Sequence, residues 1–258
     1  MRAFTKPYRK VTATPAIDVD SLAILAPMQY LSERLLATKT GRPGGAREAH
    51  REAIADQQHR RILAATGRLI AERGCAGTTI ERIAKQARVS SITFYDHFAS
   101  KEEAFAAAFE QAVAEARARL AREAPADLPW QLQIREGLRA LLGMIAADPE
   151  RARMCLVETQ KGGSGLLAHY EAVLDSAVPK LREGRRLGAG AETLPETLEE
   201  ATAAGIAWLL REHLEAAGSE GIETMLPRLL DIALGPYLGS AEALRLSALA
   251  TEGDGRRR

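Results

Sequence analysis

The stretch Val89–Glu103, VSSITFYDHFASKEE, stands between two Ala-rich segments that have helical periodicity. It is too crowded with Ser, Thr and aromatic residues for an ordinary amphipathic helix, yet Phe94 and Phe98 are four residues apart and share a helical face. Ser90 is placed to cap a short helix. Ser100 and Glu103 have capping-box spacing. The stretch therefore predicts a short helix over 91–97, a bend, and a long helix from 101.

Two more helices are predicted before this stretch. The segment HRRILAATGRLIAERG, residues 59–74, has one apolar helical stripe and a final glycine suited to a helix end. That stripe contains Ile62, Leu63, Leu69 and Ile70. The segment TTIERIAKQA, residues 78–87, opens with Thr78 and Glu81 in capping-box spacing. A short helix, a tight turn and the helix over 91–97 together form a helix-turn-helix arrangement.

The side chains of the helix over 91–97 indicate what it does. If Val89, Phe94 and Phe98 fill a small core, the hydroxyl residues and Tyr95 remain at or near the surface. Threonine can contact a base edge or a thymine methyl group, and tyrosine hydroxyls commonly bind phosphate oxygens. These residue types favour binding to double-stranded DNA. The alternative is a capped structural helix within a bundle.

Composition and charge agree with an all-α protein that has a polyanionic partner. The chain has 258 residues, of which 46% are hydrophobic and 5% aromatic, with abundant Ala, Leu, Glu and Arg. Residues 1–101 contain 17 Lys or Arg and 9 Asp or Glu, a net charge of +8, whereas residues 102–258 have −7. No apolar run is long enough for a membrane span. We expect a cytoplasmic protein without membrane contact, with Cys75 and Cys155 reduced.

The run TTIERIAKQARVSSITFYDHFASKEEAF resembles the N-terminal domain of the tetracycline-repressor (TetR) family of bacterial transcription regulators. The resemblance covers about residues 56–110 and rests on a preceding ERG, then T-x-x-x-I-A-x-x-A-x-V-S, T-F-Y-x-H-F and S-K-E-E. The family pattern usually has glycine where this chain has Arg88. The turn must therefore accommodate a side chain, and the added cation is suited to face phosphate.

By this resemblance, the helix over 91–97 is the recognition helix in the major groove. The predicted DNA-binding residues are Thr78, Thr79, Arg88, Ser90, Ser91, Thr93, Tyr95, His97 and Lys101. Ser90, Ser91 and Thr93 approach base edges or nearby phosphates, and Tyr95 and Lys101 hold the backbone. For His97, packing against the first helix is the alternative. The expected partner is an operator duplex with an inverted repeat, bound by a homodimer.

The resemblance also implies a C-terminal helical domain that binds a small-molecule effector and forms the dimer. Helices are predicted over 128–147, 150–160, 164–186, 195–217 and 221–238. Candidates for the effector pocket are Trp130, Met144, Met154, His169 and Tyr170, each with plain core packing as the alternative. Candidates for the dimer interface are Ala201, Gly205, Trp208, Met225, Leu229 and Ile232; the alternative is that both faces are buried against their own chain.

The predicted organisation is therefore an extension over 1–45, a helix-turn-helix domain over 46–100, an effector and dimerisation domain over 101–240, and a tail over 241–258. We expect a regulator, in the usual case a repressor that a ligand releases from its operator. The sequence has no metal-ligand spacing, no nucleotide-binding glycine loop and no catalytic motif, so no cofactor, metal or enzymatic activity is predicted. The rival interpretation is a helical protein-interaction module.

Overall fold

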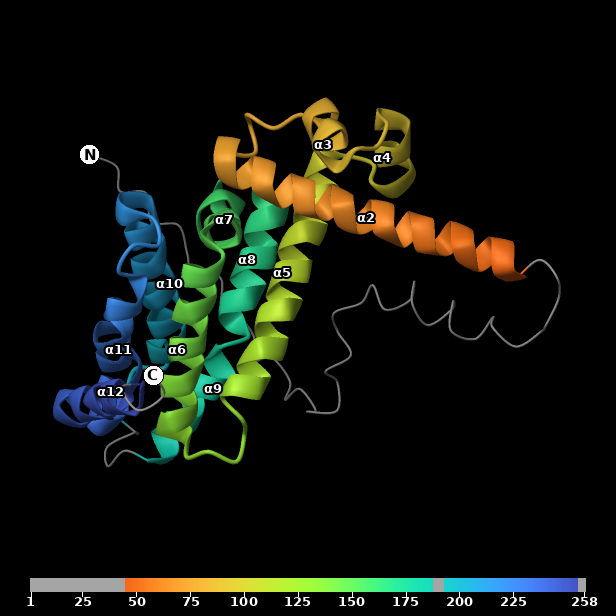
Figure 1. The fold of residues 1–258 in the computed structure, drawn as a ribbon. Coiled ribbons are helices and arrows are strands. Elements are labelled where there is room, and N and C mark those ends of the chain that lie inside the picture. Colours follow the sequence, from red (N-terminus) through yellow and green to blue (C-terminus); the bar gives the residue numbers. More distant parts are fainter. Residues whose placement is uncertain (1–44, 188–192, 255–258) are drawn as a thin grey trace, which may run out of the picture. The chain divides into compact units, whose positions relative to one another are not determined.

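All regular structure in the described residues is helical, which confirms the predicted all-α fold (Figure 1). The computed structural model describes residues 45–187 and 193–254, with side chains over 48–187 and 193–248. The predicted extension over 1–45 lies outside these residues except for Gly45. No helix within the described ranges is long and apolar enough to cross a membrane.

Three helices and the start of a fourth build the first core. They are α2 (Gly45–Arg73), α3 (Ile80–Ala87), α4 (Ser91–His97) and α5 (Lys101–Glu123). The predicted apolar stripe of α2 is buried, and Gly74 ends that helix with φ +71°. Side chains that are at most 4% exposed fill this core: Ile62, Ile70, Ile83, Phe94, Phe98 and Phe105.

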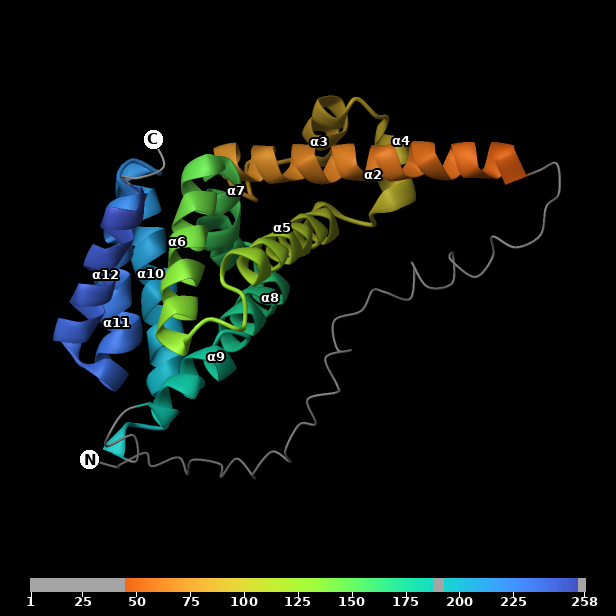
Figure 2. The same ribbon diagram turned by 60° about the horizontal axis from the view of Figure 1, so that its bottom comes forward.

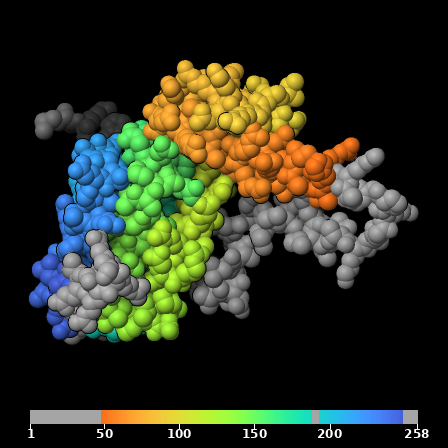
Figure 3. All heavy atoms as spheres, in the orientation of Figure 1, coloured from red at the N-terminus to blue at the C-terminus, as the bar shows by residue number. Residues whose placement is uncertain are grey.

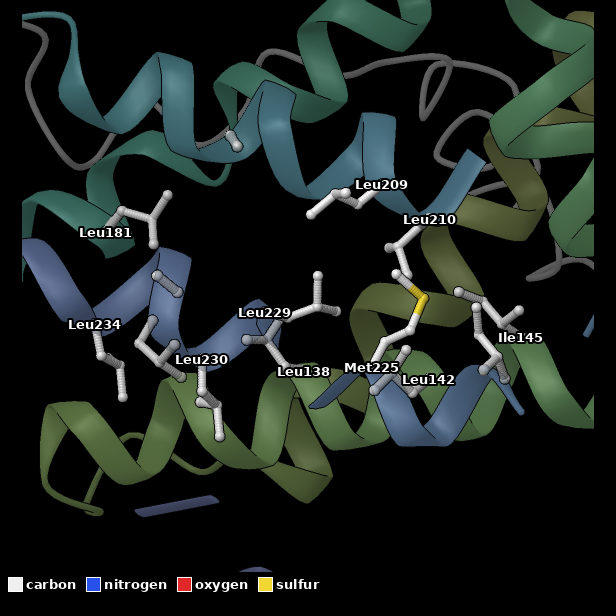
Figure 4. Packing of buried hydrophobic residues seen from close by; sticks show 14 of the residues in the cluster. Leu138, Leu142, Ile145, Leu181, Leu209, Leu210, Met225, Leu229, Leu230 and Leu234 are labelled. Atoms are coloured by element: carbon white, nitrogen blue, oxygen red, sulfur yellow. The ribbon is translucent and has the colours of Figure 1, made fainter. Parts of the chain in front are cut away.

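Most of the remaining helices contribute to a second and larger core. The remaining helices are α6 (Trp130–Ala147), α7 (Pro149–Arg153), η1 (Met154–Glu158), η2 (Thr159–Lys161), α8 (Ser164–Asp175), α9 (Val178–Arg182), η3 (Glu183–Arg186), α10 (Leu198–Ala217), η5 (Ile222–Met225), α11 (Leu226–Leu238) and α12 (Ser240–Asp254). Helices α6, α10 and α11 lie side by side in both ribbon views (Figures 1 and 2). Their leucines meet between them, with Leu138 and Leu142 of α6 facing Leu229 and Leu230 of α11 (Figure 4).

The structure departs from the predicted helix boundaries in two internal places. The expected helix over 164–186 is divided into α8, α9 and η3, because Pro179 has no amide hydrogen and lies in the first turn of α9. The expected helix over 150–160 is divided by a π-helical turn, η1, in which Val157 is completely buried and Glu158 is 4% exposed. Both predictions identified helical segments and were wrong about their continuity.

The expected C-terminal tail over 241–258 is instead largely helix. Gly239, with φ +81°, ends α11, and α12 begins at the next residue. Ala243 is completely buried and Leu246 is 5% exposed, both within the larger core. The last four residues, 255–258, lie outside the described part of the chain.

Candidate DNA-binding site

The turn between α3 and α4 is fixed by backbone hydrogen bonds. Arg88 adopts a left-handed conformation, with φ 54° and ψ 48°, where the family pattern usually has glycine. The Val89 amide donates to the carbonyl of Ala84 at 3.0 Å, and the Arg88 amide donates to the carbonyl of Lys85 at 3.2 Å. This pairing satisfies the last carbonyls of α3. The guanidinium of Arg61 donates to the Arg88 carbonyl at 2.8 Å and so ties the turn to α2.

Ser90 caps α4, as its sequence position predicts. Its hydroxyl accepts a hydrogen bond from the Thr93 amide at 3.0 Å and lies 2.9 Å from the Thr93 hydroxyl. Thr93 is half-buried, and its hydroxyl is already engaged with Ser90. The two hydroxyls therefore form one polar unit at the start of α4.

The outer side of α4 exposes residues that can reach a partner. Ser91 and Asp96 are exposed, the side chain of Tyr95 is 58% exposed, and that of Ile92 is 76% exposed. Phe94, which is completely buried, and Phe98, which is 4% exposed, anchor the opposite side. Helix α4 is therefore a short rigid helix with one face free, and the segment from α3 to α4 lies at the molecular surface (Figure 3).

Ile92 is not among the DNA-binding residues predicted from the sequence, because its spacing showed only that it lies off the Phe94–Phe98 face. A signal was available: an isoleucine off the buried face of a seven-residue helix must be exposed. In the sequence it follows the exposed Ser91 and precedes Thr93, and it is itself exposed. Ile92 therefore joins the candidate contact residues.

Histidine 97 packs against α2, which is the alternative that its sequence position left open. Its ring centroid lies 5.7 Å from that of His59, and the His59 ring stacks on Phe98 at 5.0 Å. Burial and then the nearby His97 lower the pKa of His59, while Asp56 acts in the opposite direction. His97 is half-buried, so its position combines packing with partial access to a partner.

Thr78 and Lys101 serve the structure of the domain. Thr79, not Thr78, caps α3, because the Thr79 hydroxyl accepts from the Arg82 amide at 3.4 Å. Thr78 is 1% exposed, and its hydroxyl donates to the Gly74 carbonyl at 2.9 Å. The ammonium group of Lys101 donates to the carbonyls of Cys75 at 2.8 Å and Thr78 at 3.0 Å. Thr78 therefore has no surface left for DNA, and Lys101 ties α5 to the loop before α3.

The five residues predicted to line an effector pocket do not gather in one place. Trp130 donates to the Lys180 carbonyl at 2.7 Å and packs edge-on against Tyr237. Met154 is 2% exposed and belongs to the first core, where its sulfur lies close to Gly67 of α2. Tyr170 packs with Phe109 and Ala207 in a third small core.

The other two pocket candidates lie elsewhere. Met144 is half-buried on α6, and His169 is paired with Glu110 of α5 at 3.1 Å. A surface hollow of about 210 Å³ between α8, α9 and α10 contains none of the five candidates. The prediction of one shared pocket is therefore not supported by their positions.

The residues predicted to form the dimer interface divide between the two helices. On α10, Ala201 is exposed, Gly205 is half-buried, and Trp208 is 51% exposed. On α11, Leu229 is completely buried and Met225, just before it, is 9% exposed. Ile232 is half-buried against the larger core. Met225 and Leu229 are thus buried against their own chain, whereas Ala201, Gly205 and Trp208 form an outer stripe on α10 that is not fully buried.

Among the described residues, no group of His, Cys, Asp and Glu side chains is arranged to hold a metal ion. Both cysteines are unpaired thiols, and burial raises the pKa of Cys155 to about 12. That thiol therefore remains protonated and unreactive at neutral pH.

Helices α2 to α4 define the helix-turn-helix class of domain, with α4 in the position of a recognition helix. Residues 62–108 match the family model of bacterial regulatory proteins, tetR family. The helix-turn-helix domain of this chain therefore matches the tetR family model, which confirms the resemblance read from its sequence.

Known proteins extend this similarity. An uncharacterized HTH-type transcriptional regulator of Mycobacterium tuberculosis is 27% identical over 126 residues, which are 45% of this chain and 55% of that relative. The chain thus spans about half the length of the curated relative that it matches.

Two solved structures share the fold over most of the chain. FadR from Bacillus subtilis, in complex with stearoyl-CoA, has a TM-score of 0.58 and 18% identity, covering 69% of this chain and 97% of that one. AibR, in complex with isovaleryl coenzyme A and operator DNA, has a TM-score of 0.55 and 17% identity, covering 70% and 98%. At these identities the similarity shows the fold alone.

Proposed function

We propose that this protein is a sequence-specific DNA-binding transcription regulator that acts as a homodimer, in the usual case a repressor released by a small molecule. The observation that carries the proposal is the free face of α4. Its exposed Ser91, Ile92 and Tyr95 stand on a helix that Phe94 and Phe98 fix from behind. A preorganised helix with small hydroxyl and apolar side chains suits the major groove.

The proposed DNA contacts fall into two groups. The first group contacts base edges and consists of Ser91, Ile92 and the Ser90–Thr93 unit. In the second group, the Tyr95 hydroxyl donates a hydrogen bond to a phosphate oxygen. Thr79 at the start of α3 and Arg88 in the turn add contacts to the backbone. We leave Thr78 out of the proposed contacts because its side chain is buried, and we assign Lys101 to holding the loop before α3.

The proposed effector is an acyl-coenzyme A thioester. Both solved structures described above were obtained with an acyl-CoA, and they share the fold of this chain. A ligand that favours one spacing of the two recognition helices would shift the dimer between operator-bound and free forms. The class is tested directly by adding stearoyl-CoA and isovaleryl-CoA to the protein–operator complex, with free coenzyme A as the control for the acyl chain.

Selection of the purified protein against a random duplex library at two salt concentrations tests the function itself. We expect an enriched inverted repeat whose half-sites are about 34–36 Å apart, or a multiple of that distance. Affinity should fall steeply as salt rises, because binding releases counterions from the phosphates. A folded protein that enriches no duplex would refute specific DNA binding and favour the protein-interaction alternative.

A further inference from the structure

A second feature of the helix-turn-helix domain lies outside α4. It is an open surface groove of about 510 Å³ between one face of α2 and the C-terminal end of α3. Three alanines and five longer side chains line it, and the longer ones are Gln57, Arg61, Arg68, Gln86 and Arg88. We call this hollow the arginine groove. All of its functional groups are guanidinium or amide groups, so the lining has donors and positive charge but no carboxylate.

The charge of the arginine groove is not neutralised locally. Within the part of the chain that the structure describes, neither Arg68 nor Arg88 forms an ion pair, and both are exposed. Arg61 is half-buried and donates one hydrogen bond to the Arg88 carbonyl at 2.8 Å. A guanidinium has five N–H donors, so this bond orients Arg61 and leaves donors for an anion.

The backbone of Arg88 adds an independent observation. Among the described residues, it is the only non-glycine residue with a positive φ, at 54°. A residue with a Cβ atom is disfavoured in this conformation, which glycine adopts freely. A guanidinium is therefore placed on the groove at a position where glycine would make the more stable turn. A side chain that is retained although it makes the turn less stable is typical of functional positions.

We propose that the arginine groove binds backbone phosphates of the DNA duplex beside α4. The inference rests on the proposed function and adds a phosphate-binding surface on α2 to it. Arg88 lies two residues before Ser90, the cap of α4, so a duplex that receives α4 in its major groove brings a phosphate strand near the groove. The planar guanidinium fork binds phosphate through two parallel hydrogen bonds. A free phosphate compound has the same chemistry, and the test separates the two sources.

The first test is the salt dependence of DNA binding by Arg68→Gln. If Arg68 contacts a phosphate, the slope of log K against log salt should become shallower by about 0.9 for each protomer, or about 1.8 for a dimer. The loss should be equal for all duplexes, because a phosphate carries no sequence. The matched control is Arg122→Gln, which removes the same charge from the exposed end of α5 and should leave the slope unchanged.

The second test is Arg88→Gly, in which affinity for DNA should fall without any loss of stability. The variant should melt at the same or a higher temperature, because glycine suits the left-handed turn. Its affinity for every duplex should fall roughly tenfold, as expected for the loss of a charge-assisted hydrogen bond. A merely structural role of Arg88 would change stability and affinity together.

The outcomes separate the inference from the function on which it rests. Because phosphate binding needs no particular sequence, the slopes are measured on an arbitrary duplex as well as on any selected site. Unchanged slopes in Arg68→Gln and Arg88→Gly would overturn the inference while leaving a selected operator intact. Inorganic phosphate or ATP that binds in an Arg68-dependent manner, with no effect of Arg68→Gln on DNA, would assign the groove to a free anion and also overturn it.

Discussion

At the scale of single residues, α4 shows how exposure separates contact residues from supporting ones. Phe94 and Phe98 are conspicuous in the sequence because of their size, yet they are buried. Ile92 is less conspicuous, although its spacing away from the Phe94–Phe98 face already indicated an exposed side chain, and in the structure it is 76% exposed. An apolar side chain held in the major groove has one distinctive target, the methyl group of thymine.

Replacing Ile92 with alanine should therefore remove discrimination between thymine and uracil. In the selected site, each thymine is replaced in turn by deoxyuridine, which lacks only the methyl group. When uracil replaces the contacted thymine, the wild-type protein should lose about 0.8 kcal/mol of binding free energy, or roughly fourfold in affinity, for each half-site. Ile92→Ala should bind both duplexes equally well. A uracil penalty that is the same in both proteins would exclude Ile92 as the methyl contact.

The His59–His97 contact predicts how pH affects the helix-turn-helix domain. The pKa of His59 is lowered in the folded protein, so the unfolded chain takes up its proton first as pH falls below the ordinary histidine value of about 6.5. The contribution of His59 to stability should therefore be fully present above that value and be lost as pH falls below it. Thermal unfolding without DNA, from about pH 8 to about pH 5, should show a smaller drop for His59→Gln than for wild type. Equal drops would mean that this site contributes nothing.

At the scale of elements, local signals predicted the helix-turn-helix better than the larger domain. Ser90 and Ser100 cap their helices as their spacing predicts, because a cap depends on residues three positions apart. Thr78 and Thr79 both had suitable chemistry, and only packing decided that Thr78 turns inward. The π-helical turn at Met154–Glu158 had no local signal, because it depends on which side chains the two cores accept.

Helix α12 occupies most of the segment predicted as a tail, and its Ala243 and Leu246 fall on one buried helical face. Leu246→Ala should destabilise the protein by about 2–4 kcal/mol, since it removes a buried side chain. The matched control is Leu244→Ala on the same helix, where the side chain is 52% exposed and a change within about 0.5 kcal/mol is expected. Chemical denaturation measures both. Equal effects would indicate that α12 does not pack on α11 in solution.

At the scale of the whole molecule, the large side chains predicted to line one effector pocket are divided among several cores. Met154 was predicted to line the effector pocket, but it packs in the core of α2 to α5, beside Gly67. The guanidinium of Arg153 also donates to the Ala71 carbonyl near the end of α2 at 3.1 Å. The segment around η1 is therefore joined to the helix-turn-helix core. Sequence spacing indicates which apolar residues share a helical face, whereas the core to which they belong depends on contacts between distant helices.

Whether a helix can form the interface of the proposed dimer depends on how much of its apolar surface is already buried in its own chain. Along α11 only Pro227, Arg228 and Pro236 are exposed, so little of its apolar surface remains for a partner. Helix α10 keeps an outer stripe of small residues, Ala201, Ala204 and Gly205, which leads to Trp208 with 51% of its surface exposed. Small residues let two helices approach closely, and a tryptophan at the centre of such a surface is a common energetic hot spot. We therefore propose the α10 stripe as the interface of the homodimer.

Trp208→Glu should convert the proposed dimer into a folded monomer. Burying a carboxylate in place of an indole should cost at least about 2 kcal/mol, which weakens dimerisation roughly 30-fold or more. Sedimentation equilibrium measures the mass, and circular dichroism checks that the helices persist. The matched control is Leu244→Glu, an equally exposed apolar residue on α12, which should leave the dimer intact. The monomer should also lose the requirement for two half-sites, since that requirement comes from the two-fold symmetry of the dimer. A Trp208→Glu protein that remains dimeric would place the interface elsewhere and leave Trp208 as an ordinary surface residue.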